Sequence, residues 1–347
     1  MKIKIIPVLL MITLLLSGCN SYLEVSNRNF VQIIGIDKTR DGFSLTMKLF
    51  EGKSDGADNQ GKTKEVKNIT TEGKTFTDAV TKASIKEGKK IFLGHCNMIA
   101  VGNSVEDVYK DLDCLLTGNT VPLSAKIVMC DNPADFVNAE NSSVSVDILK
   151  RKVESGEASE SNLFSLFESK NTSGGFIIPI AEIKEKAIGF SGGQLIKNGK
   201  KSERADDKTM TGLSLINNSV KNIMISVQKD NKTAGVMLGT IKMKIKTTLE
   251  ADGIYAEYML ETEGKVTDNP DLMTINEIEK ATDKYLTDKI TPALYDVSKA
   301  GVDVINIKKI LKIQQPEFYN AHKDEQIFEL LRFSVKTTCT LDEQLKL

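Results

Sequence analysis

The sequence has 347 residues, and its 46 Lys and Arg side chains almost balance its 47 Asp and Glu side chains, which argues against a nucleic-acid-binding surface. With 27% charged and 40% hydrophobic residues, the composition is that of a soluble globular body. Only two His and no Trp are present, which disfavours a zinc site and stacking sites for sugars or bases.

The N-terminal segment has the three parts of a secretory signal. Lys2 and Lys4 supply positive charge, Ile5 to Leu16 is almost wholly apolar, and Leu16-Ser17-Gly18-Cys19 follows. The apolar run is shorter than the roughly 20 residues that a transmembrane helix needs. The last four residues resemble a bacterial lipobox, which implies diacylglycerol on the Cys19 sulfur, cleavage before Cys19 and a membrane anchor. An ordinary signal peptide with an incidental cysteine is the alternative.

The next region predicts interleaved strands and helices. An apolar run over 30–36 predicts a buried strand, and alternating apolar residues over 43–49 predict a second strand that follows the turn at Asp41-Gly42. Further strands are expected at 66–71, 91–101 and 123–129. Helices are expected at 75–87 and 144–153, and two more should begin after an N-cap at Ser104 and at Pro133. Because hairpins accompany the helices, we expect a mixed sheet with helices on one face rather than a doubly wound parallel sheet.

The C-terminal region has the clearest periodicity. Residues 241–249 and 254–260 alternate and predict a hairpin across Asp252-Gly253. Thr274 and Glu277 predict a capping box that opens a long helix, in which Pro292 should introduce a kink. Helical segments at 303–313 and 325–331 and a last strand at 333–339 complete an expected antiparallel sheet with helices on a single face.

Polar segments divide the chain. Residues 154–175 are rich in Ser, Glu, Asn and Gly and predict a linker or long loop, and the composition shifts again at 197–209. We expect a signal peptide over 1–18, an N-terminal α+β region over 19–196 and a C-terminal α+β domain over 197–347. The N-terminal region is also compatible with two subdomains, with the boundary between them near 140–175. The fold class predicted for the whole chain is α+β, multi-domain, with mixed or antiparallel sheets and helices packed on them.

No catalytic motif is assembled by the sequence, so we predict no catalytic residue, no cofactor and no metal site. The run Gly189 to Gly193 lies between short strand-like segments and indicates a turn rather than a phosphate loop. His95 and Cys96 are neighbours on an expected strand, so their side chains should point to opposite faces and could not act as a base and a nucleophile.

The sequence leaves open whether the cysteines pair and what a row of lysines contacts. The thiols beyond the signal could pair outside the cytoplasm, or their apolar neighbours could bury them as free side chains; they are Cys96, Cys114, Cys130 and Cys339. Lys242, Lys244 and Lys246 form a row on one strand face. This row is either a solvated face that hinders aggregation or a contact for anionic lipid or an acidic partner.

An ordered set of motifs extends along the chain. It begins with the lipobox and Gly35-Ile36-Asp37-Lys38, continues with Gly73-Lys74-Thr75-Phe76 and Lys89 to His95, and later includes Ala187-Ile188-Gly189-Phe190, Gly193-Gln194-Leu195 and Thr211-Gly212-Leu213. This order resembles the Ger(x)C lipoproteins, the C subunits of GerA-type germinant receptors in endospore-forming bacteria. The subgroup stays open, because Val304-Ile305-Asn306-Ile307 stands where the family often has an aromatic-glycine end.

The resemblance implies three α+β domains and a non-enzymatic subunit, anchored by lipid on Cys19 to the outer face of the spore inner membrane. It would act with integral-membrane A and B subunits in nutrient-triggered germination.

Two other classes of protein stay open. A lipoprotein solute-binding protein of a transporter fits the tether and the length but needs two doubly wound lobes. A surface hydrolase needs a convergent polar site.

Overall fold

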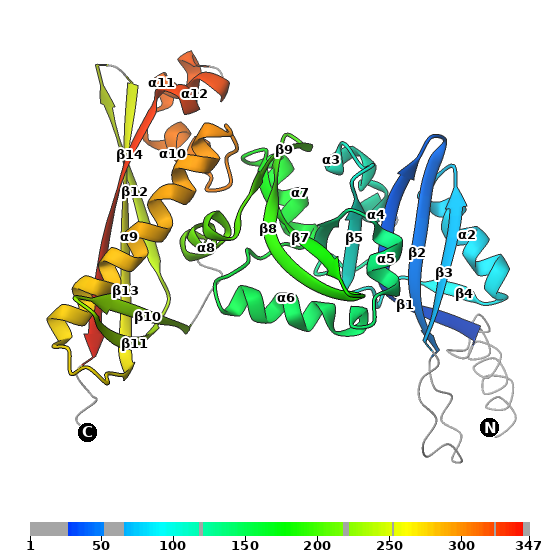
Figure 1. Cartoon of the computed structure of the whole chain (residues 1–347). Helices are drawn as coiled ribbons and strands as arrows, with labels where there is room; N and C mark the ends of the chain where they lie inside the picture. The colour runs from blue at the N-terminus through cyan, green and yellow to red at the C-terminus, as the bar shows by residue number, and fades with distance from the viewer. Residues whose placement is uncertain are drawn as a thin grey trace, which may run out of the picture.

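The computed structural model describes residues 27–51, 66–117, 121–217, 222–251, 253–322 and 324–342. Figure 1 shows an elongated arrangement in which the strands of the two halves form separate sheets. The short helix α8 (Asp207–Ile216) lies between them. The signal segment and Cys19 are outside the described residues.

The first sheet contains nine strands within the described residues, in the order β3-β2-β1-β5-β6-β7-β8-β9, with β4 also paired to β1. Parallel pairs at its centre are flanked by antiparallel hairpins. Its strands are β1 (Arg28–Thr39), β2 (Gly42–Glu51), β3 (Val66–Gly73), β4 (Lys90–Phe92), β5 (Met98–Gly102), β6 (Lys126–Cys130), β7 (Gly175–Lys184), β8 (Ala187–Lys197) and β9 (Lys200–Ala205).

Helices cover both faces of this sheet, so the expectation of helices on one face is wrong. One apolar core lies under α2 (Phe76–Glu87), α3 (Val108–Asp111), α4 (Cys114–Thr117) and α7 (Leu163–Asn171). A second core lies under α5 (Pro133–Asn138) and α6 (Ser145–Glu154), and η2 (Ser142–Val144) joins these two helices. All five residues of β5 are buried, and a continuous apolar run of this kind is typical of a strand covered on both sides.

The second sheet has five strands in the described part of the chain, in the order β10-β11-β13-β12, with β14 on β13. They are β10 (Ile223–Lys229), β11 (Lys232–Leu238), β12 (Lys242–Glu250), β13 (Gly253–Asp268) and β14 (Leu331–Asp342). The predicted hairpin is present, because β12 and β13 pair antiparallel from Lys242 with Glu261 to Glu250 with Gly253. The last strand instead runs parallel to β13, so the sheet is mixed rather than antiparallel.

The long helix α9 (Ile275–Lys299) packs on one face of the second sheet. The predicted capping box opens it: Thr274 accepts from the Glu277 N–H, and the Glu277 carboxylate accepts from the Thr274 N–H at 3.0 Å. The helix continues through Pro292. It is followed by α10 (Ile307–Gln314), α11 (Pro316–Ala321) and α12 (Asp324–Leu330).

Two glutamines cover the outer edge of β12. The Gln314 side chain accepts from the Thr247 N–H at 2.8 Å and donates to the Ile245 carbonyl at 2.9 Å, and Gln315 donates to the Thr247 carbonyl at 3.0 Å. These bonds occupy backbone groups that would otherwise be free to pair with another strand.

The predicted fold class, α+β with mixed sheets and packed helices, is confirmed. Several local expectations are wrong, two of them in the first half of the chain. Residues 154–175 include α7, whose Leu163, Leu166 and Phe167 are buried in the core. Ser104 does not cap a helix: it hydrogen-bonds Asp37, and α3 begins instead at an N-cap formed by Asp107. The division at 196/197 stays a prediction.

Candidate functional site at the junction of the two sheets

Helix α8 contacts both halves of the chain. Its N-cap Asp206 accepts from the Thr209 N–H at 2.8 Å, and this bond is the largest of the effects that lower the Asp206 pKa. The Thr209 hydroxyl then donates to Asp296 on α9 at 2.6 Å. Gly212 lies so close to α9 that a Cβ there would approach the Ala293 Cβ to 2.5 Å. The lack of a side chain at 212 therefore sets how closely α8 packs on α9.

Asp303 organises the other side of the junction. Its carboxylate is 1% exposed and accepts from the N–H groups of Ile307 at 2.8 Å and Lys308 at 3.1 Å, so it caps α10. Burial raises its pKa, although these bonds oppose the rise. Lys308, also buried, donates to the Ser173 carbonyl at 3.2 Å, which links α10 to the segment before β7.

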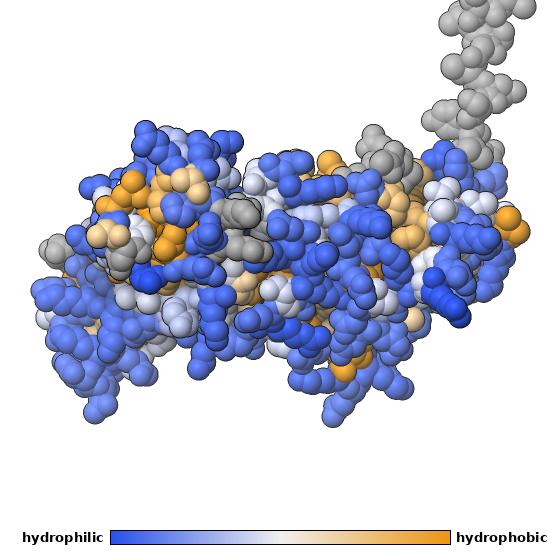
Figure 2. All heavy atoms as spheres, turned by 90° about the horizontal axis from the view of Figure 1, so that it is seen from above, coloured by the Kyte–Doolittle hydropathy of each residue, from blue (hydrophilic) through white to orange (hydrophobic). Residues whose placement is uncertain are grey.

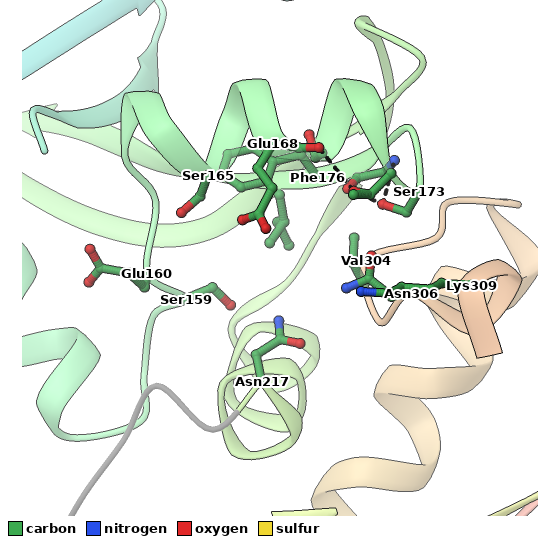
Figure 3. Close-up of a pocket in the computed structure, with 14 residues that line it drawn as sticks. Ser159, Glu160, Ser165, Glu168, Ser173, Phe176, Asn217, Val304, Asn306 and Lys309 are labelled. Carbon is green, nitrogen blue, oxygen red and sulfur yellow. Dashed lines mark hydrogen bonds between the residues drawn. The ribbon is translucent and has the colours of Figure 1, made fainter. Parts of the chain in front are cut away.

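A cavity of about 350 Å³ lies beside this contact. Its walls come from three parts of the chain: the segment from Ser159 to Ile177, the end of α8 at Asn217, and the turn and first residues of α10. Figure 3 shows side chains from all three converging on the same space. Most are polar, and the apolar part of the lining is Phe176, Ile177 and Val304.

Ser159 is the most unusual side chain in this cavity. It is 2% exposed, and its hydroxyl has no hydrogen-bond partner among the described residues. Figure 3 shows the hydroxyl pointing into the open space, while the neighbouring Glu160 points away. Glu160 forms an ion pair with Lys126. A buried hydroxyl without a partner loses its hydration at a cost of about 1–3 kcal/mol.

The lining of the cavity is mostly polar and carries few charged side chains. Among the cavity residues in the described ranges there are hydroxyls, amides, two carboxylates and one lysine, but no His or Cys. No hydroxyl there is bonded to a side chain that could take its proton as a general base.

Comparison with known proteins identifies the family. The family model described as "Spore germination protein N-terminal domain" matches residues 21–183, and the one described as "Spore germination B3/ GerAC like, C-terminal" matches residues 191–344. The chain belongs to the spore germination GerAC family. This confirms the resemblance indicated by the ordered motifs.

A solved structure, "Crystal Structure of the GerBC protein", has a TM-score of 0.60 to this GerAC-family chain at 17% identity. The match covers 89% of this chain and 96% of that one, so the two share a fold. No curated protein matches the sequence significantly.

None of the four cysteines in the described part of this GerAC-family chain forms a disulfide bond. Burial raises the pKa of Cys96 and Cys339 to about 12 and also raises that of Cys130, so these thiols are poor nucleophiles. Cys114 is half-buried, with its pKa raised by burial to about 11. Lipidation of Cys19 stays a prediction, because this residue is outside the described ranges.

The structure places the other sequence candidates away from the cavity. His95 lies in a turn rather than on a strand, packed edge-on against Phe30 at 5.0 Å between ring centroids. Gly189 to Gly193 form part of β8 rather than a turn, with Gly193 against Met210 of α8. The Lys242, Lys244 and Lys246 side chains are exposed on the second sheet.

The described part of the chain has neither a metal-binding cluster nor a membrane-spanning helix. Within the described ranges, no three His, Cys, Asp or Glu side chains come together in a way that could hold a metal ion. No helix in the part that the structure describes is both long and apolar enough to cross a membrane.

Sequence reasoning missed the cavity residues. Ser159, Asn217 and Lys309 come from separate segments, and none belongs to a local motif. The only signal was the polar composition of residues 154–175, which predicted a linker and not one wall of a cavity.

Proposed function

We propose that this chain is the C subunit of a nutrient germinant receptor and acts without enzymatic activity in spore germination. The proposal is carried by the two family models, which match residues 21–183 and 191–344 and so span both halves of the chain. In the described lining of the junction cavity no hydroxyl is hydrogen-bonded to a carboxylate, which supports a binding or transmitting role.

We further propose that Cys19 carries the lipid and holds the body on the outer face of the spore inner membrane. The lipobox Leu16-Ser17-Gly18-Cys19 supports this anchor. Anchoring restricts the body to a surface and raises its effective concentration towards integral-membrane A and B subunits, its proposed partners.

The alternative of a solute-binding protein of a transporter finds less support. That class needs two similar doubly wound lobes, whereas the two sheets here differ in strand number, order and direction. A hydrolase finds less support too, because one of the two cavity carboxylates, Glu160, points away from the space and is paired with Lys126.

Deletion of the coding sequence in the sporulating host tests the proposed function. Purified mutant spores should lose the response to some nutrients while sporulation and the response to a receptor-independent trigger stay normal. Restoring the gene should restore the response. Normal germination across a broad nutrient panel, in a strain that also lacks any second copy of a GerAC-family gene, would contradict the proposal.

The anchor is tested separately. Cys19→Ala should release the protein from membranes, whereas Cys114→Ala, which changes a half-buried thiol that lies outside the lipobox, should leave it membrane-bound. The measurement is fractionation followed by immunoblotting. Equal membrane retention of both variants would show that lipid on Cys19 is not the main tether.

A further inference from the structure

Basic side chains gather where the first sheet begins. Glu87, the last residue of α2, accepts from Asn29 of β1 at 3.5 Å and pairs with Lys67 of β3 at 3.0 Å. Lys90 of β4 is the register partner of Arg28 in β1. Figure 1 shows α2 and β4 beside the start of β1, far from the second sheet. We call this group the basic patch, and its members are Arg28, Lys67, Lys86, Lys89 and Lys90.

Neighbouring side chains leave much of this charge unbalanced. Glu87 offsets Lys67, but Lys86 and Lys90 are exposed, and neither has an ion-pair partner among the described residues. Ile85, which precedes Lys86 on the exposed face of α2, is 75% exposed. An exposed aliphatic side chain among lysines suits a lipid headgroup region, where the apolar group enters the interface and the ammonium groups contact phosphates.

The lysine row of β12 differs from the basic patch in its neighbours. Lys242 lies opposite Glu261 of β13, and Lys246 lies opposite Glu257. Lys244 also pairs with Glu261 at 3.7 Å. Opposite charges therefore face each other across this pair of strands. Of these two groups of lysines, the basic patch presents the unbalanced positive charge.

The sequence limits how far the basic patch can lie from the proposed anchor. Arg28 follows Cys19 by nine residues, and a chain of that length spans at most about 30 Å. With lipid on Cys19, the patch is therefore confined to the neighbourhood of the bilayer in every molecule. A link this short gives an effective concentration of about the millimolar range, so a weak attraction to the surface is enough to dock the patch.

We propose that the basic patch and Ile85 dock the body on an anionic lipid bilayer, the same membrane that holds the lipid on Cys19. The ammonium groups of Lys86 and Lys90 contact lipid phosphates, and Ile85 lies among the headgroups. This inference rests on the proposed anchor and deepens it. The lipid alone attaches the chain at one point, whereas docking also fixes which end of the body faces the membrane.

The experiment uses the full chain purified from membranes and added to preformed vesicles. One vesicle is phosphatidylcholine alone, and the other also contains about 30% phosphatidylglycerol. A fluorophore is attached at Ile85→Cys in a Cys114→Ala background, and brominated lipids quench it where it meets the bilayer. Quenching should be strong in anionic vesicles and weak in neutral ones. It should decline as NaCl rises from about 0.1 M to about 0.5 M, because salt screens the attraction.

A second labelling site is the control for position. Leu272 is 83% exposed in the connection between β13 and α9, in the other half of the chain. A fluorophore at Leu272→Cys, in the same Cys114→Ala background, should remain unquenched in both kinds of vesicle. The comparison separates docking of the basic patch from general adhesion of the body to lipid.

Paired charge variants locate the attraction. Each lysine near an anionic surface strengthens binding roughly fivefold, so the double variant Lys86→Gln, Lys90→Gln should lower the docking constant roughly 25-fold. The matched control is Lys242→Gln, Lys246→Gln, which removes two lysines that face glutamates on the second sheet. This control should be quenched at Ile85→Cys as strongly as the unchanged chain.

Flotation with the vesicles separates the docking from the anchor. A chain that floats but shows equal quenching at Ile85→Cys in both vesicles, or none, overturns the docking and leaves the anchor standing. Quenching at Leu272→Cys as strong as at Ile85→Cys overturns the docking too, and so does an equal loss of quenching in the two double variants. A chain that floats with neither vesicle overturns the anchor and, with it, this inference.

Discussion

Gly175, the first residue of β7, lies directly against the backbone of Asp303, which caps α10. A Cβ at position 175 would stand 2.5 Å from the Asp303 carbonyl oxygen and 2.6 Å from its nitrogen. The first strand after α7 and the turn after α9 thus meet backbone to backbone, with no side chain between them. This contact fixes the distance between the walls of the junction cavity.

Gly175→Ala should therefore destabilise the protein. The new methyl group meets backbone atoms that cannot rotate away, and overpacking of this kind costs about 1–3 kcal/mol. Gly189→Ala in β8 is the control, because a Cβ there meets nothing within 4 Å, and its stability should stay within about 0.5 kcal/mol. Urea denaturation followed by circular dichroism measures both. Equal midpoints for the two variants would refute the close contact.

Gly212→Ala tests the packing of α8 on α9. Alanine favours a helix over glycine by about 1 kcal/mol, but its methyl group would overlap Ala293 and the Lys289 carbonyl. We expect the overlap to exceed this gain, giving a net loss of roughly 1 kcal/mol in the free energy of unfolding. Thr211→Ala, one residue earlier and half-exposed, should be nearly neutral. A more stable Gly212→Ala protein would contradict the predicted overlap.

The capping box of α9 should make stability depend on acidic pH. Hydrogen bonds from the Thr274 N–H and hydroxyl, together with Lys229, lower the pKa of Glu277 to about 2. Because this pKa lies below its ordinary value of 4.5, the contribution of the carboxylate is present above pH 4.5 and is lost as the pH falls towards 2. Glu277→Gln keeps an acceptor and removes the charge.

The Glu277→Gln variant should melt at a lower temperature than the unchanged protein at pH 7. The difference between the two melting temperatures should become smaller as the pH falls from 4.5 to about 2. Thr274→Ser, which keeps the hydroxyl, should show no such gap. A gap that is constant with pH would mean that the carboxylate charge has no role in the cap.

Lys48 is a buried cation, and within the described residues its ammonium group donates to a neutral group, the Ser142 hydroxyl, at 2.6 Å. Burial lowers its pKa, so the charged form is disfavoured in the folded state. The charged ammonium group therefore lowers the free energy of unfolding at neutral pH, and this destabilisation diminishes as the pH rises towards 10.5, the ordinary pKa of lysine.

Lys48→Met should consequently raise the free energy of unfolding at pH 7 by about 1 kcal/mol, and this advantage should shrink near pH 10. Lys246→Met, at an exposed position of β12, should be neutral at both pH values. Denaturation midpoints in urea give the comparison. A destabilised Lys48→Met protein would show that the bond to Ser142 outweighs the desolvation of the ammonium group.

Features encoded within a few residues could be predicted from the sequence. The Thr274–Glu277 box and the hairpin of β12 and β13 each depend on local spacing, and both are present as expected. The fold class followed from the same signals. Family membership followed from short motifs in a fixed order, which needs no knowledge of which segments touch.

Features that depend on distant partners could not be predicted. Thr46 and Lys48 alternate with apolar residues in β2 and so indicated an exposed face, yet they are buried because α5 and η2 cover that face. The parallel direction of β14 depends on the path of the chain through α10 to α12. Ser159 and Lys309 share a cavity only because the two halves of the chain meet at Gly175 and Asp303.

The position of β14 has a consequence for synthesis of the protein. It pairs with β13 along twelve residues and bonds to α9 through Asp283, which accepts from the Cys339 N–H at 2.7 Å. A nascent chain extends from its N-terminus, so β13 keeps an open edge until residues 331–342 have been made. A premature stop before Leu331 would leave that edge free to pair with other chains, and the truncated product should aggregate or be degraded rather than persist as a shorter folded form.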